Sequence, residues 1–158
     1  MLVIIGCGNL TRGDDGVGPW VAQQLLVWHA EHPKPSIQIY DAGTAGMEVM
    51  FQAKGADALV IVDACLTDSA PGTLYEVPGA ELDAEPDNAY NLHDFRWDNA
   101  LFTGRKIFGD AFPTDVTVFL IEAQTIEFGI GLSPKVQGTA DRVVGKITEK
   151  IEGWAQWG

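Results

Sequence analysis

Uninterrupted apolar runs divide the chain and predict its buried strands. Leu2–Ile5 and Ala58–Val62 are of this kind, and runs of about four to eight such residues are typical of strands covered on both faces. Val116–Ile121, in which Thr117 is the one polar residue, also predicts a strand. Ser36–Tyr40 alternates apolar and polar residues, and Thr73–Val77 is a short β-prone run. We therefore expect five strands, with Thr73–Val77 at an edge of the sheet.

Between these runs, apolar residues recur at helical spacing. The segment after the first strand carries such a stripe, and Pro19, which lacks an N–H, places the helix start near residues 15–18. Ser133 and Pro134 open the last helix as N-cap and first helical residue. The two stripes are Val17, Trp20, Val21, Leu25 and Trp28, and Val136, Ala140, Val143, Val144, Ile147 and Ile151.

Two further helices are expected from shorter signals. Met47–Gln52 reads as a short helix between the second and third strands. Asn91 can cap another helix that holds His93 near its start and that Gly104 would end. Phe95 and Leu101 would face the core from this helix.

Alternation of strands and helices predicts the fold class. Residues 1–158 should form a single α/β domain with a doubly wound, mostly parallel five-stranded sheet and helices on both faces. The sequence contains no internal repeat and no linker-like segment that would separate a second domain. In such sheets ligands bind outside the carboxyl ends of the strands.

Composition narrows the class of partner. The formal net charge is −12 with a pI near 4.4, which argues against nucleic acid and anionic membrane surfaces, where basic patches carry the affinity. No apolar run approaches the ~20 residues of a membrane span, and no signal peptide precedes the first strand. We expect a cytoplasmic protein whose two cysteines, Cys7 and Cys65, are buried reduced thiols.

The turn from Gly6 to Gly18 carries the most distinctive chemistry. It begins like a dinucleotide-binding loop, but Thr11 replaces the third glycine, and Asp14 and Asp15 would oppose a bound pyrophosphate. Asp41, after the second strand, imitates a ribose-binding acid, so a nucleotide-binding protein stays open as an alternative. A P-loop is excluded because the chain lacks its Gly-Lys-Ser/Thr signature.

A metal site is the other interpretation of the same acids. Asp15 follows the first strand, Asp63 ends the third, and His93 could reach the same edge from its helix start. Two carboxylates and one imidazole suit borderline divalent ions such as nickel or zinc, and three protein ligands leave positions open for water or substrate. Taken alone, an aspartate at a strand end is more often a turn former, and a histidine at a helix start is more often a cap or a surface residue.

Read together, these segments resemble the [NiFe]-hydrogenase maturation endopeptidases. The resemblance begins with Gly6-x-Gly8-Asn9 and Asp14-Asp15-Gly16-Val17-Gly18, and it covers nearly the whole chain in order. It continues through Asp41-Ala42-Gly43-Thr44-Ala45-Gly46-Met47, Val60-Ile61-Val62-Asp63-Ala64, Asn91-Leu92-His93 and Gly131-Leu132-Ser133-Pro134.

The resemblance implies a function and a set of site residues. Members remove a short C-terminal extension from the precursor of the hydrogenase large subunit after nickel insertion, an activity classed as aspartic-type endopeptidase. By motif position the metal-binding and catalytic residues are Asp15, Asp63 and His93. The turn containing Asp41, Gly43 and Thr44 corresponds to a loop linked to substrate recognition.

Nickel would then be supplied by the substrate, the hydrogenase large-subunit precursor, since no cysteine joins the ligands. The chain offers no serine or cysteine nucleophile beside a suitable base, which favours metal-assisted hydrolysis. A non-catalytic nickel-sensing maturation chaperone on the same fold is the main rival, and a nucleotide-binding protein the lesser one.

Overall fold

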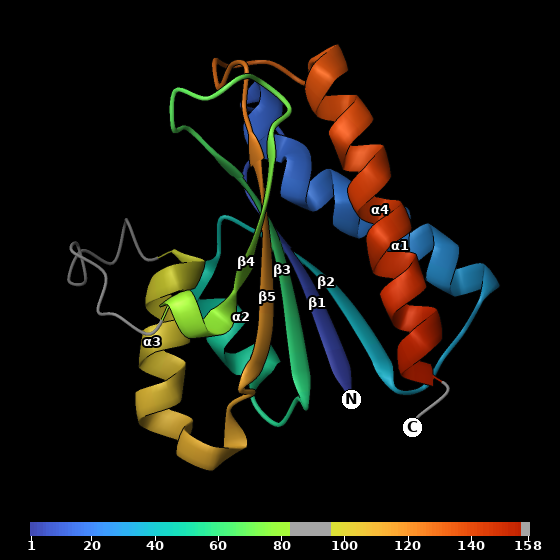
Figure 1. The fold of residues 1–158 in the computed structure, drawn as a ribbon, viewed down its shortest axis with the longest axis vertical. Helices are drawn as coiled ribbons and strands as arrows, with labels where there is room; N and C mark the ends of the chain where they lie inside the picture. The colour runs from blue at the N-terminus through green and yellow to red at the C-terminus, as the bar shows by residue number, and fades with distance from the viewer. Residues whose placement is uncertain (83–95, 156–158) are drawn as a thin grey trace.

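The computed structural model describes residues 1–82 and 96–155. Asn91, His93 and Phe95, on which the predicted helix start depends, lie outside these ranges. The described elements are β1 (Leu2–Cys7), α1 (Val17–Glu31), β2 (Ile37–Gly43), α2 (Gly46–Ala53), β3 (Ala58–Cys65), β4 (Leu74–Pro78), α3 (Trp97–Phe108), β5 (Asp115–Glu122) and α4 (Pro134–Ala155) (Figure 1).

The strands form one five-stranded sheet in the order β2-β1-β3-β5-β4. Neighbouring strands are parallel except for β4, which pairs antiparallel with β5 at one edge. This arrangement confirms the predicted fold class and the edge position of the short fourth strand. The strand order reverses between β1 and β3, so the carboxyl ends of these two strands flank the topological switch point.

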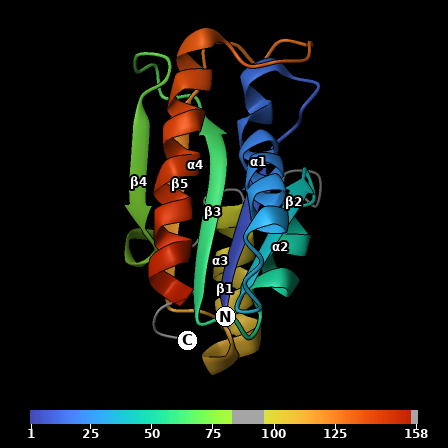
Figure 2. The ribbon, with the colours of Figure 1, turned by 90° about the vertical axis from the view of Figure 1, so that its right-hand side faces the viewer.

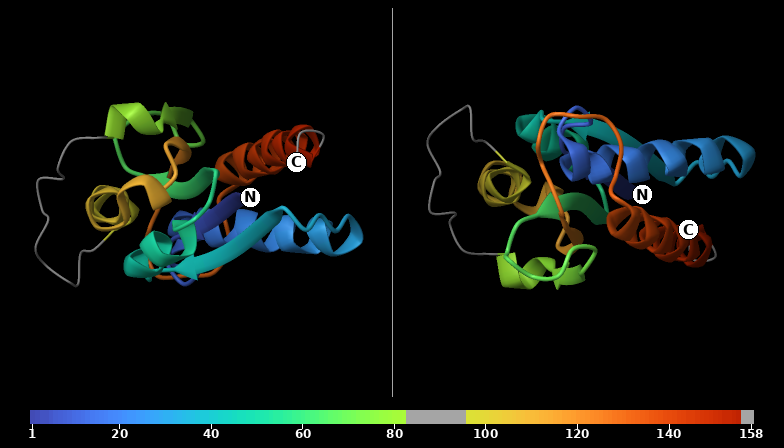
Figure 3. Two further views of the ribbon diagram at one scale, coloured as in Figure 1. Left: turned by 90° about the horizontal axis from the view of Figure 1, so that it is seen from below. Right: turned by 90° about the horizontal axis from the view of Figure 1, so that it is seen from above.

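Helices cover both faces of the sheet. α1 and α4 pack on one face, and α2 and α3 pack on the other (Figures 2 and 3). The predicted stripes of α1 and α4 point into the first of these two layers, with Trp20, Trp28 and Val144 partly buried at its margin. The alternation of side chains along β1 and β3 divides their apolar residues between the two layers.

The strands run further than their apolar residues suggest. Asp63 lies inside β3 because the ladder with β5 continues to Cys65 opposite Glu122. Asp41 likewise lies inside β2, opposite Gly6 of β1. The predictions that Asp63 ends its strand and that Asp41 follows its strand were therefore wrong, because each strand continues two residues beyond its acid. Both acids remain at the carboxyl edge.

Gly104 does not end α3. The helix continues to Phe108, and Gly109, with a φ of 50°, follows it. A Cβ on Gly104 would lie 2.3 Å from the Phe112 ring, so this glycine lets the aromatic ring pack against the helix. Leu101 is buried, as the pattern predicts.

No helix in the described part of the chain is both long enough and apolar enough to cross a membrane.

Candidate active site at the carboxyl edge of the sheet

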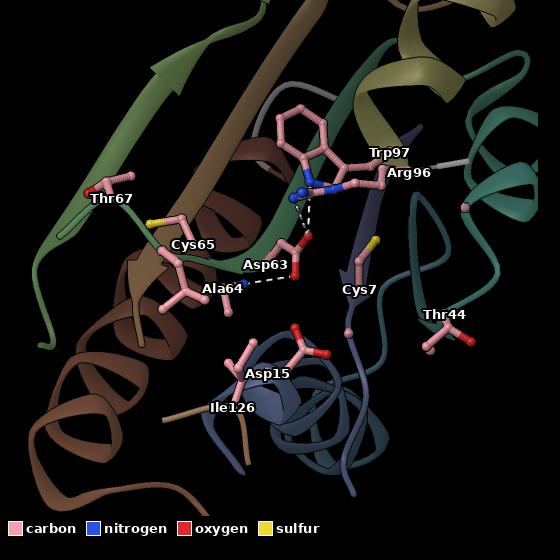
Figure 4. Close-up of a pocket in the computed structure, with 14 residues that line it drawn as sticks. Cys7, Asp15, Thr44, Asp63, Ala64, Cys65, Thr67, Arg96, Trp97 and Ile126 are labelled. Carbon is pink, nitrogen blue, oxygen red and sulfur yellow. Dashed lines mark hydrogen bonds and ion pairs between the residues drawn. The ribbon is translucent and has the colours of Figure 1, made fainter. Parts of the chain in front are cut away.

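A cavity of about 520 Å³ opens where β1, β2 and β3 end (Figure 4). Asp15 and Asp63 both line it, so the structure brings two of the three predicted metal ligands together. The remaining lining residues are Cys7, Gly8, Gly43, Thr44, Gly46, Ala64, Cys65, Leu66, Thr67, Arg96, Trp97 and Ile126.

Glycines in the turn after β1 allow Asp15 to reach this cavity. A Cβ on Gly18 would lie 2.1 Å from the carbonyl oxygen of Cys7 and 2.5 Å from that of Val62. At Gly8, with a φ of 139°, a Cβ would lie 1.9 Å from the carbonyl oxygen of Asp15. Only glycine fits at such contacts, and the start of α1 can therefore cross directly over the ends of β1 and β3.

Asp15 is half-buried and has few internal partners. Its carboxylate accepts one hydrogen bond that the structure shows, at 3.2 Å from the backbone N–H of Asn9. Figure 4 shows this carboxylate directed toward the space in front of Asp63. The side chain therefore keeps acceptor sites that a ligand in the cavity can use.

Asp63 is nearly buried, with 7% of its surface exposed. Its Oδ1 accepts a hydrogen bond from the N–H of Ala64 at 2.8 Å, and its Oδ2 accepts one from the indole Nε1 of Trp97 at 2.9 Å. Burial raises the pKa of Asp63 to about 7, and the neighbouring Asp15 carboxylate adds to the rise, although the Ala64 N–H, Arg96 and Trp97 oppose it. A cation in the cavity would favour the ionised form.

Arg96 and Trp97 line the candidate site, and sequence reasoning did not identify them. The Arg96 Nη2 lies 3.8 Å from Oδ2 of Asp63, and both side chains line the cavity. Arg96 and Trp97 reach Asp63 because side chains alternate along β3. Asp63 lies on the same face of the strand as Leu59 and Ile61, which pack in the layer with α2 and α3. No spacing or motif in the sequence connects a residue at the start of α3 with a strand 34 positions earlier.

Asp14, the neighbour of Asp15, points away from the cavity and is completely buried. Its carboxylate accepts hydrogen bonds from the backbone N–H groups of Gln124, Thr125 and Ser133 and from the Ser133 hydroxyl, at 2.7–3.2 Å. Ser133 also accepts the first backbone bond of α4, from Gln137 at 2.8 Å. Asp14 therefore fastens the segment before α4 to the turn after β1.

Asp41, Gly43 and Thr44, which the resemblance links to substrate recognition, lie at or beside the cavity. Gly43 and Thr44 line it, and they also line a smaller hollow that contains Asp41. The Asp41 carboxylate accepts hydrogen bonds from the Gln23 side chain and from the N–H of Gly43, each at 3.0 Å. Gly43 has a φ of 51°, a conformation that favours glycine.

The two cysteines are free thiols in different surroundings. Cys7 is buried, as expected, and burial raises the pKa of its thiol. Cys65 is only partly buried and lines the cavity, contrary to the expectation for it, because it lies at the last position of β3. Burial, together with a hydrogen bond from Sγ to Oε2 of Glu122 at 3.1 Å, raises the pKa of Cys65 to about 12.

In residues 1–82 and 96–155, no group of three or more histidine, cysteine, aspartate or glutamate side chains is arranged to hold a metal ion. The described part of the site thus offers two carboxylates, Asp15 and Asp63. His93, the third predicted ligand, lies outside the described residues.

Comparison with known proteins gives a consistent result. The sequence model of the hydrogenase maturation proteases (HycI) matches residues 22–150. "Hydrogenase 2 maturation protease" of Escherichia coli K12 is 27% identical over 148 residues, covering 92% of this chain and 87% of that protein. "Coenzyme F420 hydrogenase subunit delta" of Methanothermobacter thermautotrophicus is 28% identical over 155 residues, covering 95% and 94%.

Solved structures agree on the fold. The hydrogenase maturating endopeptidase HybD from E. coli superimposes with a TM-score of 0.77 at 24% identity, covering 96% of this chain and 92% of that one. A HycI maturation protease from Thermococcus kodakarensis gives 0.72 at 20% identity, with 94% and 90% covered. The chain belongs to the hydrogenase maturation protease family, whose members are endopeptidases.

Proposed function

We propose that this chain is a nickel-dependent endopeptidase that removes the C-terminal extension of a [NiFe]-hydrogenase large-subunit precursor. The observation that supports it best is that Asp15 and Asp63 line one open cavity at the switch point of the sheet. His93 would be the third ligand by its place in the sequence pattern. Membership of the hydrogenase maturation protease family is established above; the use of nickel, the identity of the substrate and the roles of these three residues are what we propose.

The donor set fits a divalent cation. Asp63 is buried, its pKa is raised to about 7, and a second carboxylate adds to this rise. Two carboxylates that disfavour each other's ionisation are stabilised when a cation lies between them. Oxygen and imidazole ligands suit a borderline ion such as nickel, and the two acids keep unused lone pairs toward the cavity.

Nickel is expected to arrive with the substrate. A site with two carboxylates and one imidazole lacks the thiolates that hold such an ion most tightly. Two thiols line the cavity, those of Cys7 and Cys65, and burial raises the pKa of both, to about 12 for Cys65, which keeps them protonated at neutral pH. The free protease would therefore carry little nickel, and the metal already held by the precursor would complete the site.

Each part of the cavity then has a role. Asp15, Asp63 and His93 would bind the substrate's nickel and thereby place the tail in register, which is how proximity lowers a barrier. Gly43 and Thr44 would form the wall along which the tail lies, with Asp41 holding their turn. A divalent ion supplies polarisation of a carbonyl or activation of water.

The test is a cleavage assay on a large-subunit precursor that carries its C-terminal extension. Nickel-loaded and nickel-free precursor are each mixed with wild-type protein, and a chelator is added to the reaction with nickel-free precursor. The mobility shift of the large subunit is then followed. Cleavage of the nickel-loaded form alone is expected. Asp15→Asn, Asp63→Asn and His93→Ala should each abolish or strongly slow it.

Matched controls exist elsewhere on the surface. Asp115→Asn changes an exposed aspartate at the first position of β5, at the opposite edge of the sheet, and His32→Ala changes an exposed histidine after α1. Both should process precursor at the wild-type rate. Efficient cleavage of nickel-free precursor would contradict nickel dependence, and binding without cleavage would favour the nickel-sensing chaperone.

A further inference from the structure

Two large apolar side chains beside the site are almost fully exposed. Phe128 has 90% of its surface exposed and Ile130 has 89%, the highest values among the large hydrophobic residues of the described chain. They flank Gly129 in the segment between β5 and α4. A single exposed apolar residue is ordinary, but two in one short loop form a local apolar surface, and such surfaces mark interaction sites. We call residues 126–130 the apolar loop.

The apolar loop is held firmly against the turn after β1. Gly129 donates a backbone hydrogen bond to the carbonyl of Thr11 and accepts one from the N–H of Gly13, each at 2.8 Å, so that it forms an isolated parallel bridge with Arg12. The Nε of Arg12 donates to the carbonyl of Ile126 at 3.2 Å. These bonds fix the backbone from which Phe128 and Ile130 project.

Asp14 anchors both ends of the same segment. Its buried carboxylate accepts hydrogen bonds from Gln124 and Thr125 before the loop and from Ser133 after it. In addition, the N–H of Asp14 donates to the carbonyl of Thr125 at 2.9 Å. A loop fixed at both ends and in its middle has little conformational freedom to lose on binding, which favours affinity.

The apolar loop is continuous with the cavity. Ile126, its first residue, lines the cavity and lies next to Asp15 in Figure 4. The turn to which the loop is bonded is the one that carries Asp15. A polypeptide segment that contacts Ile126 in the cavity is therefore close to the rest of the apolar loop.

We propose that the apolar loop is a docking surface for an apolar patch of the polypeptide substrate, with Phe128 and Ile130 as its anchors. This rests on the proposed function, because it takes the occupant of the cavity to be part of a protein substrate. Docking on a rigid loop bonded to the Asp15 turn holds the substrate protein while its tail lies in the cavity. Aromatic residues such as Phe128 are enriched at protein–protein interfaces, and the neighbouring Ile130 adds apolar area that binding can bury.

The test measures binding and cleavage separately. Phe128→Ser, Ile130→Ser and the double variant are compared with wild-type protein for affinity toward nickel-free large-subunit precursor under chelation, by biolayer interferometry. The rate of cleavage of nickel-loaded precursor is measured in parallel. We expect affinity to fall about tenfold for each single variant and about a hundredfold for the double variant, with cleavage at low precursor concentration slowed to match.

Ile107→Ser and Val27→Ser are the matched controls. Ile107 and Val27 are exposed large hydrophobics, at 62% and 63%, near the end of α3 and on α1. Both controls should bind and cleave like wild type. Thermal unfolding should be unchanged in the loop variants, since the side chains of Phe128 and Ile130 contribute little to the core.

The outcomes separate this proposal from the proposed function. Loop variants that bind and cleave like the controls overturn the docking surface and leave the proposed function standing. Wild-type protein that binds precursor through the loop but never cleaves it supports docking and overturns the proposed function. Failure of wild-type protein to bind the precursor overturns the docking proposal. A dimer seen by sedimentation that Phe128→Ser dissociates also overturns it, because a second copy of the chain would then cover the loop.

Discussion

Asp14 and Asp63 are both buried carboxylates near the same edge of the sheet, but their surroundings differ. Asp14 accepts four hydrogen bonds from the segment 124–133 and does not line the cavity. Asp63 accepts two, has a second carboxylate nearby, and opens onto the cavity. Burial alone therefore does not tell a structural acid from a candidate ligand.

The number of donors around each carboxylate explains the difference. A buried charge is costly unless hydrogen bonds or ion pairs compensate it. At Asp14 four donors do so, and the carboxylate acts as a fastener between two loops. At Asp63 burial outweighs two donors and a guanidinium at 3.8 Å, so the pKa rises to about 7. The incompletely compensated acid is the one suited to receive a cation.

Removing the Asp14 carboxylate should have the largest effect on stability. Asp14→Ala leaves three backbone N–H groups and the Ser133 hydroxyl without their acceptor. We expect the free energy of unfolding to fall by about 3–5 kcal/mol, since four hydrogen bonds to one buried carboxylate are lost together. Urea denaturation measures this. Asp115→Asn, an exposed acid at the other edge, should change stability by less than about 0.5 kcal/mol.

A stability loss for Asp14→Ala no greater than that for Asp115→Asn would contradict a structural role for the Asp14 carboxylate. It would mean that the segment 124–133 contributes nothing through its bonds to Asp14.

The second prediction concerns Asp63 and pH. The pKa of Asp63 is about 7 in the folded state against an ordinary value of 3.8, so between about pH 4 and 7 the folded state binds more protons than the unfolded state. Stability contributed by this group is therefore present at low pH and is lost as pH rises through that window. Asp63→Asn removes the titrating group. The unfolding free energy of the variant should therefore rise relative to that of wild type by on the order of 4 kcal/mol as the pH increases from about 4 to 8.

The measurement is the difference in unfolding free energy between Asp63→Asn and wild type at several pH values. An amide cannot accept both hydrogen bonds as the carboxylate does, but that loss is nearly independent of pH and leaves the slope intact. A flat difference would show that Asp63 titrates normally. Processing by Asp63→Asn should be lost at every pH at which wild type is active, which separates stability from function.

A smaller effect is expected at Trp97. Trp97→Phe keeps an aromatic ring but removes the indole N–H that Oδ2 of Asp63 accepts, at a cost of about 1–2 kcal/mol. Since that hydrogen bond lowers the pKa of Asp63, its loss should raise the pKa further and move the pH window of stability upward. Trp28→Phe, on α1 at the margin of the other layer, is the control and should leave the window in place.

What the sequence predicts well is set by local periodicity. The apolar runs of β1, β3 and β5 and the stripes of α1 and α4 identify these elements, because burial imposes a repeat that the chain itself displays. Their alternation also predicts the parallel sheet, and hence an edge at which Asp15 and Asp63 meet.

What it predicts poorly depends on distant contacts. Asp14 and Asp15 are adjacent in sequence, and only the segment more than 110 residues later decides which is buried. Gly104 looks like a helix end until the Phe112 ring is packed against it. The partners of Asp63 at Arg96 and Trp97 come from the fold, through the side of β3 on which α3 packs.

The smallest effect is expected at Cys65, whose thiol donates a hydrogen bond to Glu122, a third buried acid. Glu122 is 1% exposed and accepts hydrogen bonds from the N–H groups of Thr67 and Ser69, the Thr67 hydroxyl and the Cys65 thiol. Desolvation raises the pKa of Glu122, but these bonds together lower it below its ordinary value. Like Asp14, Glu122 accepts four hydrogen bonds and so holds a loop in place, here the loop after β3 that lines the cavity.

Cys65 lines the cavity two residues after Asp63, and its sulfur could bind nickel. Substituting it therefore tests whether Asp15, Asp63 and His93 are all of the nickel ligands. Its thiol is a donor to Glu122 and has a pKa raised to about 12, which keeps it protonated at about pH 8 and slow to react with iodoacetamide. Cys65→Ser keeps an O–H donor for Glu122, so processing should stay within about twofold of wild type and stability within about 1 kcal/mol. Loss of processing in a folded Cys65→Ser variant would identify the thiol as a nickel ligand, and two carboxylates with one imidazole would no longer describe the site.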